Sequence, residues 1–147
     1  MRAEIISIGS ELVSGQSLDT NSQWLSRELS DLGISVGLHT TLGDTLPDHV
    51  AVFRSVSERA QLAVVTGGLG PTQDDLTREA LAECAEVPLV EHPESLAAIA
   101  AMFARRNREM PERNRTQAFF PEGAVPLPNP VGTAPGVWMK IGRASFA

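Results

Sequence analysis

The chain has 147 residues, of which 42% are hydrophobic and 20% are charged, so its composition is that of one ordinary globular domain, residues 1–147. The net charge of −6 argues against non-specific nucleic-acid binding but allows a local nucleotide site. A single cysteine, Cys84, and an N-terminus without a signal-peptide pattern predict a cytoplasmic protein. No apolar run approaches the roughly 20 residues of a membrane helix, so we expect no membrane partner.

The first ninety residues alternate between strand and helix patterns. The expected elements are a strand at residues 3–8, a loop at 10–20, a helix at 22–32, a strand at 34–41, a helix capped by Asp48, a strand at 62–65 and a helix from about Leu76. This order is typical of a parallel sheet covered by helices on both faces. We therefore expect an α/β fold.

The second half of the chain is less regular. A helix is expected at residues 93–108, because Pro93 suits a first turn and apolar residues recur along one face. A shorter helical piece at 112–119 and a proline-rich segment follow it. The last expected element is a strand at 137–141.

A glycine-rich loop at residues 66–77 joins the strand at 62–65 to the next helix. Gly67, Gly68 and Gly70 let the backbone take positive φ and let a ligand approach the main chain. The N-terminus of the following helix offers free N–H groups to an anion. Asp74 and Asp75 beside such an anion site suggest that a cation bridges them to the ligand. The loop therefore predicts phosphate chemistry.

Two known phosphate motifs do not fit this loop. A P-loop needs a lysine after its last glycine, where this chain has Pro71 and Thr72. The dinucleotide fingerprint needs a third glycine where Gln73 stands. The structural alternative is a tight turn in which Thr72 and Asp75 form a capping box for the helix.

The loop after the first strand carries two more carboxylates, Glu11 and Asp19. In open α/β sheets ligands bind at the carboxyl ends of strands, so this loop is expected beside the glycine-rich one. Glu11, Asp19 and Asp75 would together hold a hard divalent cation through oxygen ligands. The alternative is that Asp19 or Asn21 only caps the helix that follows.

A third polar turn lies at residues 129–136. Its backbone N–H groups and the Thr133 hydroxyl could meet a phosphate or the polar edge of a ring. A proline-rich turn is more often structural. The arginines at 105–115 are more often a solvated helix face, but they would counter phosphate charge if their helix borders the site.

These three loops, in this order, resemble the molybdopterin-binding domain family shared by molybdenum-cofactor biosynthesis proteins and CinA proteins. The general family features are Gly9-x-Glu11-x-x-x-Gly15-x-x-x-Asp19-x-Asn21 and Thr66-Gly67-Gly68. Residues typical of the CinA branch are Gly68-Leu69-Gly70-Pro71-Thr72-x-Asp74-Asp75-x-Thr77, Arg108-x-Met110, Asn114-x-x-Gln117-Ala118 and Asn129-x-x-Gly132-Thr133-Ala134-Pro135-Gly136.

The resemblance implies a three-layer α/β/α fold with a mostly parallel sheet. It also implies hydrolysis of ADP-ribose to AMP and ribose 5-phosphate with a divalent metal, for which Mg, Mn or Co would serve. The expected catalytic residues are Asp19, Asp74 and Asp75, and the expected metal ligands are Glu11, Asp19 and Asp75. The expected substrate-binding residues are Asn21, Gly67, Gly68, Gly70, Thr72, Asn129, Gly132 and Thr133.

Asp74 stands where the cofactor-biosynthesis branch often has a basic residue, which favours a hydrolase. The alternatives are a pterin-nucleotide binding module without hydrolysis, or a structural fragment with a vestigial site. The deamidase domain of CinA proteins is not in this chain, so deamidation is not assigned. The domain is expected to be truncated after the strand at 137–141, and the unpaired sheet edge would favour a homo-oligomer.

Overall fold

The computed structural model describes the whole chain, residues 1–147, and its larger sheet has six strands. These strands are β1 (Arg2–Ile8), β2 (Ser35–Leu42), β3 (Leu62–Thr66), β6 (Val125–Leu127), β7 (Gly136–Ile141) and β8 (Ala144–Phe146). Their spatial order is β2-β1-β3-β8-β7-β6, and all run in one direction except β7. The mostly parallel sheet is therefore confirmed.

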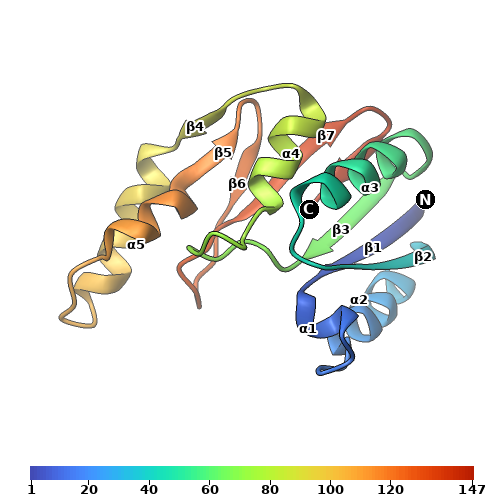
Figure 1. Ribbon diagram of the computed structural model, residues 1–147, viewed down its shortest axis with the longest axis horizontal. Coiled ribbons are helices and arrows are strands. Elements are labelled where there is room, and N and C mark those ends of the chain that lie inside the picture. Colours follow the sequence, from blue (N-terminus) through green and yellow to red (C-terminus); the bar gives the residue numbers. More distant parts are fainter.

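Helices cover both faces of this sheet (Figure 1). The helices are α1 (Ser10–Val13), α2 (Thr20–Asp31), α3 (Leu46–Arg59), α4 (Thr77–Ala85), α5 (Pro93–Ala104) and a 3₁₀ helix, η1 (Glu112–Ala118). α3 and α4 pack on one face, and α2 lies on the other. The expected three-layer α/β/α arrangement is thus confirmed. No helix is both long and apolar enough to cross a bilayer.

Side chains of β1 alternate between the two layers of the core. Ile5 packs with Leu29 of α2, whereas Ile6 and Ile8 belong to the larger cluster that contains Phe53 of α3. This alternation follows from the period of two along a strand. Both faces of β1 are buried, and its two buried polar side chains have partners: Glu4 accepts from Arg59, and the Ser7 hydroxyl bonds to that of Ser22.

An arm extends from one end of this sheet. It consists of a small antiparallel sheet of β4 (Leu89–Glu91) and β5 (Phe119–Pro121), together with α5 and η1 (Figure 1). The arm packs back onto the body through α4 and β5. It brings α5 opposite the loop between β6 and β7.

The sequence analysis did not predict four short strands. β4, β5, β6 and β8 have three residues each, too few to show a period. The expectation that the strand at 137–141 is the last strand and leaves an unpaired edge is wrong. β8 follows that strand and lies inside the sheet, paired with β3 on one side and β7 on the other.

Three helix boundaries also differ from the prediction. Residues 10–13, expected in a loop, form the short helix α1. Thr45, and not Asp48, is the N-cap residue of α3, and Asp48 lies in its first turn. α5 ends at Ala104 because Asn107 adopts a left-handed φ of 52°, and the Arg108 amide then donates to the Phe103 carbonyl at 3.0 Å.

Candidate functional site

The glycine-rich loop between β3 and α4 needs glycine at two positions. Gly67 and Gly68 have φ of 99° and 65°, which favour glycine. A Cβ at Gly67 would overlap the carbonyl oxygen of Ile8 at the end of β1. A Cβ at Gly68 would overlap the Thr77 hydroxyl, which donates to the Gly67 carbonyl at 2.9 Å. The loop is therefore held against β1 and the first turn of α4.

Asp75 closes the loop with both carboxylate oxygens. Oδ1 accepts from the Gly70 amide at 2.8 Å, and Oδ2 accepts from the Thr72 amide at 2.9 Å and its hydroxyl at 2.6 Å. The predicted pairing of Thr72 with Asp75 is confirmed, but it does not cap the helix. α4 starts at Thr77, and its N-cap residue, Leu76, makes no side-chain cap bond.

The hydrogen bonds also keep Asp75 ionised. Burial is the largest single influence and acts to raise the pKa of Asp75. The bonds from Thr72 and Gly70 and the charge of Arg78 together outweigh it, so this pKa lies below the ordinary value of 3.8. Oδ1 accepts only one bond and retains a free lone pair. Asp75 can therefore bind a cation without releasing the loop.

A buried cation lies beneath the loop. Arg78 of α4 is 1% exposed, and its guanidinium donates to the carbonyls of Leu69 and Gly70, each at 2.9 Å. Gln117 of η1 donates to the same Leu69 carbonyl at 3.3 Å and accepts from Asn114 at 2.9 Å. Both side chains donate to carbonyls of the loop, and Arg78 also adds a positive charge beside the expected anion site.

The sequence patterns did not identify Arg78. Burial lowers its pKa, and the carboxylates of Glu79 and Asp75 act in the opposite direction. A signal existed, because an arginine in the first turn of the helix after a glycine loop lies next to that loop. Gln117 was part of the resemblance motif, but nothing in the sequence linked it to Leu69.

Asp19 caps α2, as expected in the structural alternative. Its Oδ1 accepts from the Ser22 amide at 2.9 Å and its Oδ2 from the Ser22 hydroxyl at 2.6 Å. Burial, the largest influence, acts to raise the pKa of Asp19, but the hydrogen bonds from Ser22 and Ser7 and the charge of His39 lower it on balance. Asn21 is exposed in the first turn of the same helix.

The predicted set of three carboxylate ligands does not assemble. No three His, Cys, Asp or Glu side chains lie where they could hold one metal ion together. Asp19 is occupied at the start of α2, and Glu11 is exposed with its carboxylate folded over Gly9. Asp74 is exposed beside Asp75 in the sequence.

The donor set nevertheless fits one kind of cation site. Mg²⁺ is usually held by one or two carboxylates together with substrate phosphates and water. The free lone pair of Asp75 Oδ1 meets that need, and the exposed Asp74 carboxylate remains free beside it. A cage built only from protein carboxylates is not available here.

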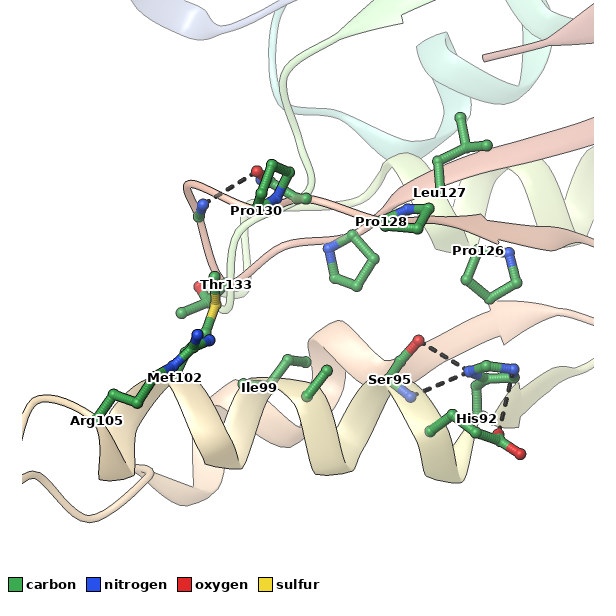
Figure 2. A pocket seen from close by; sticks show the side chains of 15 residues that line it. His92, Ser95, Ile99, Met102, Arg105, Pro126, Leu127, Pro128, Pro130 and Thr133 are labelled. Carbon is green, nitrogen blue, oxygen red and sulfur yellow. Dashed lines mark hydrogen bonds and ion pairs between the residues drawn. The ribbon is translucent and has the colours of Figure 1, made fainter.

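Asn129 holds the third loop, which joins β6 to β7. Its Oδ1 accepts from the amides of Val131 at 3.1 Å and Gly132 at 3.0 Å, and its Nδ2 donates to the Ala134 carbonyl at 3.0 Å. Asn129 and the Gly132 amide are therefore engaged inside the turn. Thr133 has no such bond and lines a cavity of about 410 Å³ between this loop and α5 (Figure 2).

The glycine-rich loop passes beside the β6–β7 loop in both views (Figures 1 and 2). The side-chain amide of Gln117 links the arm to the glycine-rich loop, because it donates to the Leu69 carbonyl. The fold and these loops thus define a three-layer α/β domain in which the glycine-rich loop lies beside the loop that Asn129 holds.

Comparison with known proteins agrees with this class. The model of the family described as a probable molybdopterin binding domain matches residues 4–146. A CinA-like protein of Synechococcus elongatus is 50% identical over 137 residues, 92% of this chain and 32% of that protein. A putative competence-damage inducible protein of Desulforamulus reducens is 48% identical over 146 residues, 99% of this chain and 36% of that protein.

Solved structures give the same result. The crystal structure of CinA from Thermoplasma acidophilum matches with a TM-score of 0.90 at 30% identity, over 99% of this chain and 87% of that one. MoaB, a molybdopterin biosynthesis enzyme of Thermus thermophilus, shares the fold, with a TM-score of 0.63 at 20% identity over 99% of this chain and 77% of that one. The chain belongs to the molybdopterin-binding domain family, in its CinA-like branch. It spans about a third of the length of the CinA-like relatives above.

Proposed function

We propose that this domain hydrolyses the pyrophosphate bond of ADP-ribose to give AMP and ribose 5-phosphate, with the help of a divalent cation. The observation that carries the proposal is the glycine-rich loop with the buried guanidinium of Arg78 beneath it. A buried positive charge beside the loop suits a pyrophosphate, which carries negative charge on the oxygens of both phosphate groups.

Each residue of the site has a separate role. The loop binds the pyrophosphate, and the buried Arg78 supplies positive charge from beneath the loop. Asp75 keeps the loop in shape and would hold the cation through its free lone pair. Asp74 is the general base, because its carboxylate is exposed and makes no bond within the chain. When bound, the cation neutralises phosphate charge and lowers the pKa of the attacking water.

The reaction is a hydrolytic displacement at phosphorus. Water attacks one phosphorus, its proton passes to the Asp74 carboxylate, and the bridging P–O bond breaks. The electron pair of that bond leaves with the second phosphate. Because Arg78 is fixed by two carbonyls, it can stabilise charge on the phosphates without moving.

The proposed roles of Asp19 and Glu11 differ from the metal-ligand roles expected from the sequence. Asp19 fixes the start of α2, and through it the loop that follows β1. Glu11 is exposed, its carboxylate lies over Gly9, and it belongs to no group of three acidic or histidine side chains that could hold a metal. We therefore propose Asp75 and Asp74 as the principal acidic residues of the site.

A second candidate function is binding of a pterin nucleotide without hydrolysis. The shared fold with MoaB favours it, since MoaB is a molybdopterin biosynthesis enzyme. The exposed Asp74 favours hydrolysis, because a carboxylate beside a bound phosphate repels it unless a cation lies between them.

The test is a product assay on the purified chain with ADP-ribose and Mg²⁺, Mn²⁺ or Co²⁺, with EDTA as the control. Hydrolysis predicts equal amounts of AMP and ribose 5-phosphate, and no product in EDTA. Tight binding of a pterin nucleotide with no product under any metal would contradict the proposal and support the second candidate.

A further inference from the structure

The cavity beside Thr133 is open to solvent and has two different walls. α5 forms one wall, with Ile99 and Met102 directed toward the cavity (Figure 2). The segment from β6 into the following loop forms the other, with Pro126 and Pro128 opposite the helix. Its volume of about 410 Å³ lies within the usual range for small-molecule sites.

The middle of the cavity is apolar and its two ends are polar. His92 and Ser95 lie at one end, and Arg105 and Thr133 lie at the other (Figure 2). Arg105 is exposed and takes part in none of the four salt bridges of the chain. Its charge is therefore free to meet an anion.

We propose that this cavity binds the nucleoside half of the substrate, with the base between α5 and the prolines. The inference rests on the proposed function, since it extends the same site beyond the pyrophosphate. A planar base has two apolar faces that gain free energy by leaving water. The ribose 5-phosphate half carries hydroxyl groups, each of which would lose a hydrogen bond against Ile99 and the prolines.

The polar ends fix the direction of the nucleotide. Thr133 and Arg105 lie at the end formed by the β6–β7 loop, and the glycine-rich loop passes beside this loop in both views (Figures 1 and 2). The 5′-phosphate of the nucleoside therefore lies at this end, next to the pyrophosphate site. The base extends toward Ser95 and His92, whose ring and hydroxyl are bonded at 2.9 Å and offer polar atoms to the base edge.

A larger side chain in place of Ala98 would block the cavity. Ala98 is exposed, lines the cavity and is not part of the buried core, so a larger side chain there fills the space without disturbing the fold. Ala97 is its matched control, because it lies beside Ala98 on α5, outside the buried core, but does not line the cavity. Both changes to Trp have the same effect on helix propensity.

The experiment measures binding of AMP and of ribose 5-phosphate by calorimetry to the wild-type chain, A98W and A97W, with thermal unfolding as the check on folding. We expect A98W to weaken AMP binding by about tenfold or more, a loss of at least about 1.4 kcal/mol, and to leave ribose 5-phosphate binding unchanged. A97W should bind both as the wild type does. Unchanged AMP binding in A98W, or no AMP binding in the wild type, would overturn the inference.

A second pair of variants tests the direction. R105Q should weaken AMP binding several-fold but leave adenosine binding unchanged, whereas R106Q, at the exposed next residue, should change neither. Equal loss for AMP and adenosine would contradict the placement of the phosphate.

The two proposals can fail separately. If the wild type binds AMP in this cavity but does not hydrolyse ADP-ribose, the inference about the cavity stands and the proposed function fails. If A98W hydrolyses ADP-ribose with an unchanged KM, the proposed function stands and the inference about the cavity fails.

Discussion

The carbonyl oxygen of Leu69 accepts a hydrogen bond from the guanidinium of Arg78 at 2.9 Å, so the glycine-rich loop is built on a buried charge. Arg78 forms no salt bridge and is bound by loop carbonyls instead. Such an arrangement costs desolvation free energy, which is recovered in part by two charge-assisted hydrogen bonds. In the proposed function, the positive charge of Arg78 attracts the anionic ligand.

Replacement of Arg78 by Met should harm both stability and anion binding. Met has a similar length but leaves the Gly70 carbonyl without its donor and removes the charge. We expect a loss of about 2–4 kcal/mol in the free energy of unfolding, measured with urea. Inorganic pyrophosphate should also bind R78M more weakly. R27M, on the surface of α2, is the control; equal pyrophosphate binding by both variants would argue against a role for Arg78 in the site.

Gly67 should tolerate no side chain. In G67A the new Cβ meets the Ile8 carbonyl, and the residue must also hold a φ of 99°. G15A is the matched control, because Gly15 has a φ of 78° but open space around it. We expect G15A to cost about 1 kcal/mol and G67A several-fold more, measured by urea unfolding. Equal costs would show that the contact with β1 is unimportant.

Stability should depend on the Asp75 carboxylate in a definite pH range. A carboxyl group whose pKa is lowered on folding adds stability that is complete above its unfolded pKa, about 4, and is lost as the pH falls through the folded value. Thr72 supplies two of the three hydrogen bonds that favour the charged form.

T72V tests this dependence, because it removes only the hydroxyl bond of an exposed residue. We expect T72V to unfold about 1 kcal/mol more easily than the wild type at neutral pH. The difference should narrow as the pH falls below the unfolded pKa of about 4 and Asp75 becomes protonated. A difference in the free energy of unfolding that stays constant over the whole range would contradict this origin of the stability.

The regular part of the fold could be predicted from the sequence because its elements are long enough to show a period. β1, α2 and α3 lie within a few residues of their expected ranges. The strands of three residues, such as β8, could not be predicted, because they are defined by their partners in the sheet and not by their own pattern.

In the candidate site, too, some features could be predicted from the sequence and others could not. Gly67 and Gly68 could be recognised because their positions demand a left-handed backbone. The roles of Asp75 and Asp19 could not be derived, since a carboxylate that closes a loop or caps a helix looks the same in sequence as one that binds a metal. Arg105 was expected to matter only if α5 borders the site, and the arm places it at the cavity.

The central claim is that Asp75 serves phosphate chemistry, and the rate of AMP release from ADP-ribose tests it most directly. The measurement compares the wild type, D75N and D31N with a saturating divalent metal, where Asp31 is an exposed carboxylate at the end of α2. We predict at least about a 100-fold loss of rate in D75N, a wild-type rate in D31N and no reaction in EDTA. A folded D75N that releases AMP at the wild-type rate would contradict the account.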